Sequence, residues 1–167
     1  TGCRESSINS KYVFNTIKGG SGRGGDGVEV IVADNYGIMS KKAAEAVAKE
    51  IKKKPNGVFA MPTGGTPFGF YAELIRMHKE EGLDFSLISA FNLDEYIGLS
   101  PDHETSYNFY MYHVFYNHVN INPDNVYIPH GLAEDPQKEA IEYENTIKRV
   151  GGIDVAILGI GRNGHIS

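Results

Sequence analysis

The stretch that decides the fold is Gly57–Tyr71, which is GVFAMPTGGTPFGFY. Its apolar run Val58–Met61 is typical of a buried strand, and Pro62 ends that strand because proline cannot donate to a sheet ladder. Thr63–Gly65 then predicts a loop in which glycine permits positive φ. Thr66-Pro67 suits the N-cap and the first residue of a helix, so a helix is expected to follow.

A strand, a glycine loop and a helix start in this order favour an anion-binding site. Unpaired N–H groups and the positive end of the helix dipole point at one place there. The alternative is a tight turn between strand and helix that binds nothing. The loop is not that of an ATPase, because the pattern G-x-x-x-x-G-K-[ST] is absent.

Composition narrows the class of protein. The chain has 167 residues, 41% of them hydrophobic and 22% charged, as in an ordinary globular domain. A formal net charge of −5 argues against nucleic-acid binding, which needs a basic face. Cys3 is the single cysteine, so an intrachain disulfide and a cysteine-built zinc site are excluded, and a reducing, cytoplasmic compartment fits. We expect no metal, no membrane span and no signal peptide.

Two segments are expected along the chain. Residues 1–27 end in a glycine-rich stretch of linker composition, and we expect them to be flexible or unrelated to the rest. A short element made by Ile8, Tyr12, Val13, Phe14 and Ile17 is an open alternative there. The folded domain is expected to span residues 28–167.

From residue 28 onwards, predicted strands and helices alternate. The expected strands are 28–33, 58–61, 87–93, 125–128 and 155–158, and the expected helices are 40–53 capped by Ser40, one from Thr66, 106–118 and 136–149. Alternation of this kind predicts an α/β fold whose sheet is mostly parallel, with helices on both faces. Ligands bind such sheets beyond the carboxyl ends of the strands.

Three chemically suggestive stretches fall at those ends: Thr63–Thr66, Asn92–Tyr96 and Gly159–His165. The last begins with G-x-G-x-x-G, but a dinucleotide fingerprint belongs in the first βα unit and precedes an acidic residue by about 20 positions. A glycine loop whose backbone holds a sugar fits better. His165, next to that loop, suits proton transfer because imidazole titrates near neutrality.

The acidic pair Asp94-Glu95 has two interpretations. An exposed pair at a strand end is often only solvated. In the functional interpretation, one carboxylate turns over the site and acts as a base. The residues alone do not choose between these interpretations.

Taken together, four stretches resemble the glucosamine-6-phosphate deaminase family. They are Met61–Pro67 (MPTGGTP), Asn92–Gly98 (NLDEYIG), Ser106-Tyr107 and Gly159–Ile166 (GIGRNGHI). The resemblance implies a modified Rossmann-like α/β fold and conversion of glucosamine 6-phosphate to fructose 6-phosphate and ammonia. It also implies no redox cofactor and no catalytic metal, and it leaves a homo-oligomer open for the full-length form.

The resemblance also implies roles for individual residues. Asp94 matches the proton acceptor that moves a proton between C2 and C1 of the opened sugar, and His165 matches the histidine that helps open the ring. Asn163 matches the residue that orients this histidine. The implied substrate-binding residues in the first loop are Thr63, Gly64, Gly65 and Thr66, of which Gly65 and Thr66 meet the phosphate. In the last loop, Gly159, Ile160 and Gly161 line the sugar.

This sequence departs from the family beyond the histidine. Family members continue with a Phe-Asn-Glu-Pro-like stretch and downstream cations, whereas this chain ends at Ser167. We therefore expect an amino-terminal portion of such an enzyme, inactive by itself. The rival hypotheses are a 6-phosphogluconolactonase-like hydrolase and a non-catalytic sugar-phosphate sensor.

Overall fold

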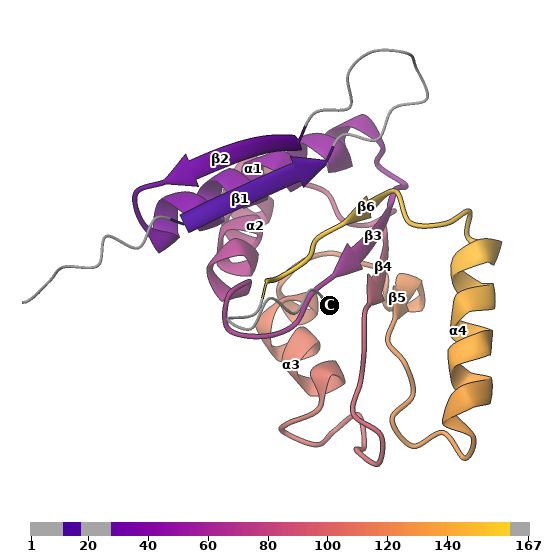
Figure 1. Cartoon of the computed structure of the whole chain (residues 1–167). Helices are drawn as coiled ribbons and strands as arrows, with labels where there is room; N and C mark the ends of the chain where they lie inside the picture. Colours follow the sequence, from indigo (N-terminus) through magenta and orange to yellow (C-terminus); the bar gives the residue numbers. More distant parts are fainter. Residues whose placement is uncertain (1–11, 18–27, 161–167) are drawn as a thin grey trace, which may run out of the picture.

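The computed structural model describes residues 12–17 and 28–160. Within them the strands are β1 (Tyr12–Ile17), β2 (Val28–Ala33), β3 (Val58–Met61), β4 (Ser89–Asn92), β5 (Val126–Tyr127) and β6 (Val155–Ala156). The α-helices are α1 (Tyr36–Lys53), α2 (Phe68–Glu81), α3 (Tyr107–Val114) and α4 (Pro136–Arg149), and the 3₁₀ turns are η1 (Tyr116–His118) and η2 (Pro123–Asn125). β5, β4, β3 and β6 form a parallel sheet in that order (Figure 1). The predicted Rossmann-like α/β fold is confirmed.

Side chains of the central strands alternate between the two faces of the sheet. Phe59 and Met61 belong to the hydrophobic core that α1, α2 and α3 share. Phe91 belongs to the opposite face, where its ring stacks on that of Tyr127. The ring of Tyr143 from α4 packs edge-on against Phe91, with the ring centroids 5.7 Å apart. Helices therefore cover both faces of the sheet.

Two helix starts differ from the sequence-based expectation. α1 begins at Tyr36 and not near Ser40, because Asn35 is the cap: its side chain accepts from the Ile38 N–H at 2.9 Å. α2 begins after Pro67, and the Thr66 side chain does not cap it. A turn bond from the Phe68 N–H to the Gly65 carbonyl leads into α2.

Several strands and helices are shorter than predicted. β4 spans four residues, Ser89–Asn92. Leu87, which was expected in the strand, lies outside it and is 60% exposed. β6 spans two of the four residues expected. The helix expected over 106–118 is α3, capped by the Ser106 side chain and followed by the separate turn η1. α4 has the predicted bounds.

The first two strands form a separate layer. β2 pairs with β1 in antiparallel register, Tyr12 opposite Ala33 and Ile17 opposite Val28, and does not join the parallel sheet. The pair lies beside α1 (Figure 1). Of the short element considered in the first segment, the part Tyr12–Ile17 is thus a strand, and Ile8 lies outside the described residues. The boundary at residue 28 stays a prediction.

One polar cluster attaches β6 to the sheet. Asp154, just before β6, accepts from the Lys54 ammonium at 2.7 Å and from the Val58 N–H at 2.8 Å. The Lys54 hydrogen bond, then the backbone bond, lower the pKa of the Asp154 carboxyl. The end of α1, the start of β3 and the start of β6 are therefore held together.

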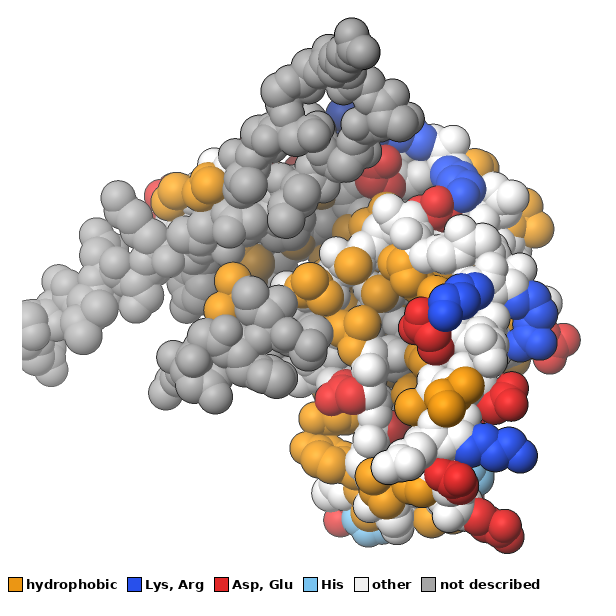
Figure 2. Space-filling model, turned by 45° about the vertical axis from the view of Figure 1, so that its right-hand side comes forward, with side chains coloured by type: hydrophobic (Ala, Val, Ile, Leu, Met, Phe, Trp, Pro, Cys, Tyr) orange, Lys and Arg blue, Asp and Glu red, His pale blue; other side chains and the backbone are white. Residues whose placement is uncertain are grey.

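The outer face beside α4 mixes charge with apolar surface (Figure 2). Leu93, Ile97, Leu132 and Ile141 are among the large exposed hydrophobic residues of the described chain. None of the described helices is long and apolar enough to span a bilayer.

Candidate active site

Two of the three predicted stretches meet at one edge of the sheet. β3 and β4 are parallel neighbours whose last residues, Met61 and Asn92, are paired in register. The loop Thr63–Thr66 and the acidic residue Asp94 follow these ends, so they lie at the same edge. The prediction that they share a place beyond the strand ends is supported by this register.

The loop Thr63–Thr66 has an exposed backbone. Gly64 has φ of 109°, a conformation that favours glycine. A Cβ added at Gly64 or Gly65 would meet no atom within 4 Å. Within the described part of the chain, the N–H groups of Gly64, Gly65 and Thr66 take part in none of the hydrogen bonds found. The loop therefore presents backbone donors to open space in front of α2.

The structure separates the two carboxylates of the acidic pair. Glu95 accepts from the backbone N–H groups of Tyr107 and Asn108, both at 2.9 Å, and so caps the first turn of α3. Asp94 is exposed, and its charge acts on the Tyr107 hydroxyl. Of the pair, Asp94 is therefore the candidate for proton transfer.

Tyr107 connects the loop to the acidic residue. Its hydroxyl donates to the Tyr96 hydroxyl at 3.1 Å, and the Thr63 side chain lies close enough to act on its pKa. The bond to Tyr96, with burial and the nearby charge of Asp94, raises the pKa of Tyr107 to about 12. Tyr107 is thus a neutral hydroxyl near neutral pH, placed between Thr63 and Asp94.

The third predicted stretch is described only in part. β6 pairs with β3 in parallel, Ala60 opposite Ala156, and the Ile157 N–H continues the ladder to the Ala60 carbonyl. Gly159 and Ile160 therefore follow β6, the neighbour of β3, and β3 is the strand that leads into the loop Thr63–Thr66. Gly161, Asn163 and His165 lie outside the described residues.

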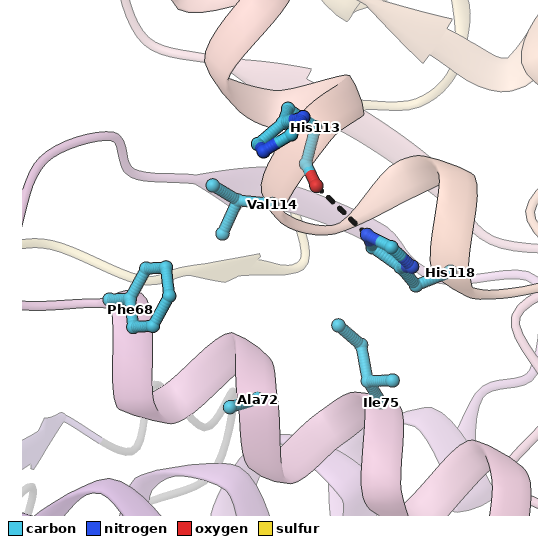
Figure 3. Close-up of a pocket in the computed structure, with 6 residues that line it drawn as sticks. All are labelled: Phe68, Ala72, Ile75, His113, Val114 and His118. Atoms are coloured by element: carbon cyan, nitrogen blue, oxygen red, sulfur yellow. Dashed lines mark hydrogen bonds between the residues drawn. The ribbon is translucent and has the colours of Figure 1, made fainter.

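Two hollows lie elsewhere on the described residues. One, of about 220 Å³, lies between α2 and the α3–η1 segment (Figure 3). His118 donates there to the His113 carbonyl at 2.8 Å, and the other lining residues are Phe68, Ala72, Ile75 and Val114. The second, of about 230 Å³, lies between α4 and the segment after β4. Neither hollow is lined by Thr63–Thr66 or Asp94.

Sequence reasoning missed the tyrosines around the site. Tyr110 packs against the hydrophobic core, and its hydroxyl donates to the Gly64 carbonyl at 2.5 Å. Tyr36, at the start of α1, donates to the Thr66 carbonyl at 2.8 Å. The only signal for Tyr107 was its place in the Ser106-Tyr107 stretch. Among the described residues no cluster of three or more His, Cys, Asp or Glu fits a metal ion.

The chain belongs to the family of glucosamine-6-phosphate isomerases and 6-phosphogluconolactonases, whose model matches residues 36–167. The sheet, the glycine loop and the acidic residue after β4 all lie in the matched range.

Individual relatives of the chain are named glucosamine-6-phosphate deaminase, which is one branch of that family. The chain is 57% identical over 139 residues to a glucosamine-6-phosphate deaminase of Thermoanaerobacter sp. (strain X514), covering 83% of this chain and 55% of that protein. It is 49% identical over 139 residues to the deaminase of Clostridium perfringens (strain 13 / Type A), covering 83% of this chain and 57% of that protein. The chain thus spans about half the length of the curated relatives it matches.

Solved structures agree with this grouping. A monomeric glucosamine-6-phosphate deaminase superposes with a TM-score of 0.77 at 46% identity, over 79% of this chain and 55% of that one. A 6-phosphogluconolactonase from Thermotoga maritima gives 0.66 at 22% identity, over 79% and 58%. The second likeness concerns the fold alone.

Proposed function

We propose that the protein to which this chain belongs converts glucosamine 6-phosphate and water to fructose 6-phosphate and ammonia. The observation that carries the proposal is the register of β3 and β4, which brings a donor-rich loop and Asp94 to one edge of the sheet. Membership of the family and the names of the relatives at 49–57% identity support it.

In this proposal the loop binds the phosphate. The exposed N–H groups of Gly64, Gly65 and Thr66 lie at the start of α2, where the helix dipole favours an anion. Phosphate binding there fixes one end of the opened sugar and directs its other end along the strand ends. Gly159, Ile160 and Gly161 line the sugar in the same proposal.

Asp94 is the proposed proton acceptor. It takes the proton from C2 of the opened sugar and returns it to C1, while the amine nitrogen loses a proton and O1 gains one, which converts the amino aldose to a ketose-type imine. Water then adds at C2 and ammonia leaves. Tyr107, whose pKa is raised by its bond to Tyr96, by burial and by the charge of Asp94, keeps its proton at the working pH. His165 and Asn163 are proposed for ring opening, as the family resemblance implies.

The remaining parts of the proposal concern the class of substrate, the cellular location and the bounds of the domain. The proposed substrate is a sugar phosphate, with no metal, redox cofactor or nucleic acid involved. The single cysteine fits a cytoplasmic location. The segment 28–167 is proposed as the part that belongs to the sugar-phosphate domain.

The test is a comparison of two activities in the purified full-length protein. Ammonia release from glucosamine 6-phosphate supports the deaminase. Acid release from 6-phosphogluconolactone without ammonia release would assign the lactonase branch. Binding of the sugar phosphate with neither activity would assign a sensor.

A further inference from the structure

The carbonyl groups of the glycine loop are held by tyrosine hydroxyls from different helices. Tyr71 of α2 donates to the Pro62 carbonyl at 2.5 Å. Tyr110 of α3 donates to the Gly64 carbonyl, also at 2.5 Å. Tyr36 of α1 donates to the Thr66 carbonyl at 2.8 Å, and its oxygen lies 3.4 Å from that of Gly65. Tyrosine hydroxyls from α1, α2 and α3 therefore donate to backbone carbonyls of the segment 62–67, which contains the loop Thr63–Thr66.

These bonds decide which way the backbone donors point. In a trans peptide the C=O of one residue and the N–H of the next are coplanar and point in opposite directions. A Gly64 carbonyl directed at Tyr110 therefore turns the Gly65 N–H away from α3. The Gly65 carbonyl accepts from the Phe68 N–H at 3.3 Å, so Tyr36 acts on the loop through the Thr66 carbonyl, to which it donates at 2.8 Å.

Tyr71 and Tyr110 remain donors over the physiological pH range. Tyr71 is fully buried, and burial raises its pKa well above the usual 10.0. Burial also raises the pKa of Tyr110. A phenol that keeps its proton continues to donate its hydrogen bond to the carbonyl oxygen.

Tyr36 has a second function at the same loop. Its oxygen accepts the Gly69 N–H at 2.7 Å, which satisfies one of the donors at the start of α2. A Cβ at Gly69 would lie 2.6 Å from the Ser40 hydroxyl and 2.8 Å from the Tyr36 ring. Glycine at this position therefore permits the close approach of α1 that brings Tyr36 to the loop.

We propose that Tyr110 and Tyr36 are positioning residues for the phosphate site, because they hold the loop carbonyls away from the ligand and leave the N–H groups facing it. The inference rests on the proposed function. It assigns a role to two helices, α1 and α3, which contribute no donor of their own to the anion.

The test measures phosphate affinity in the full-length protein with Tyr110→Phe and Tyr36→Phe. The matched control is Tyr112→Phe, on the same helix as Tyr110. The Tyr112 ring packs against that of Tyr116, with ring centroids 5.5 Å apart, and no hydrogen bond from Tyr112 to the described loop is found. The readouts are the Kd of inorganic phosphate by titration calorimetry, and KM and kcat for glucosamine 6-phosphate.

Loss of one oriented hydrogen bond corresponds to about a tenfold change in affinity. Tyr110→Phe and Tyr36→Phe should each raise the Kd of phosphate and the KM by about that factor, with kcat altered by less than about threefold. A general loss of folding would instead lower kcat and the thermal midpoint together. Tyr112→Phe should match the wild type.

The outcomes separate this inference from the proposed function. Wild-type protein that binds phosphate and releases ammonia, with both tyrosine variants equal to it in affinity, overturns the positioning role alone. An equal loss in Tyr112→Phe also overturns it. Wild-type protein that neither binds phosphate nor releases ammonia overturns the proposed function first. If Tyr110→Phe fails to fold, Tyr36→Phe decides by the same measurements.

Discussion

Asn92 and Met61 join the ends of the two strands that build the candidate site: the Asn92 side-chain amide donates to the Met61 carbonyl at 3.3 Å. Asn92 is 1% exposed, and its side-chain oxygen accepts from the Tyr116 hydroxyl at 2.9 Å. The Tyr143 hydroxyl donates to its backbone carbonyl at 2.7 Å. The residue two positions before Asp94 is therefore fixed on several sides.

Replacement of Asn92 by leucine should lower the free energy of unfolding by about 2 kcal/mol, because the Met61 carbonyl and the Tyr116 hydroxyl lose their partner in a buried place. Chemical denaturation measures the loss. Tyr116→Phe, which removes one of these bonds, should cost less. If Asn92→Leu were as stable as the wild type, the side-chain hydrogen bonds of Asn92 would contribute nothing to the free energy of unfolding.

Gly64→Val and Gly65→Val form a matched pair in the loop. Gly64 has φ of 109°, so valine there should cost about 1–3 kcal/mol of stability through backbone strain. Gly65 has no such φ, and a Cβ there meets no protein atom within 4 Å, so Gly65→Val should fold normally.

The same pair separates folding from binding. Gly65→Val should weaken binding of glucosamine 6-phosphate several-fold, because the side chain projects where the N–H groups face the anion. Glucosamine without phosphate should be affected far less. An equal loss for both ligands would make the loop a structural turn.

Glu95→Gln tests the helix cap beside the acidic residue. Glutamine removes the charge and one of the two oxygens that accept from the Tyr107 and Asn108 N–H groups, so stability should fall by about 1 kcal/mol. Ammonia release at saturating substrate should fall less than tenfold. Glu104→Gln, at an exposed position, is the control and should change neither quantity. A loss of activity as large as that from changing Asp94 would place Glu95 in the chemistry.

Asp154 should make stability depend on pH. Its pKa in the folded protein is lowered, mainly by the Lys54 hydrogen bond, so its contribution is present above the ordinary value of 3.8 and is lost as the pH falls through the lowered value. Asp154→Asn should therefore be less stable than the wild type at pH 7, and the difference should shrink towards pH 3. Urea denaturation at both pH values measures it. A difference that is the same at both would exclude the ion pair as its cause.

The order of elements was predictable because it depends on local patterns. The apolar run before Pro62 and the glycines after it predict a strand and a loop whatever lies around them. α4 was predicted to the residue, since Pro136 starts it and its polar and apolar positions alternate with helical period. The family resemblance rested on the same short stretches.

The contacts that shape the site were not predictable in this way. Tyr110 and Gly64 are 46 positions apart, and Tyr36 and Thr66 are 30 apart. These bonds depend on how α1 and α3 pack against α2, which no local pattern specifies. The cap of α1 was misplaced for a smaller reason: Ser40 is a good cap residue, but Asn35 is available earlier and α1 extends through Ser40 into the core.

The central claim, that Asp94 moves the proton in an amino-sugar phosphate isomerisation, is tested most directly by ammonia release from glucosamine 6-phosphate in Asp94→Asn of the full-length protein. Asparagine keeps the shape of the side chain but cannot accept the C2 proton, and a positioned acid–base group contributes roughly 10²–10⁴-fold. We predict a loss of turnover in that range, with phosphate binding and thermal stability retained because Asp94 is exposed. Ammonia release by Asp94→Asn at the wild-type rate would contradict the account.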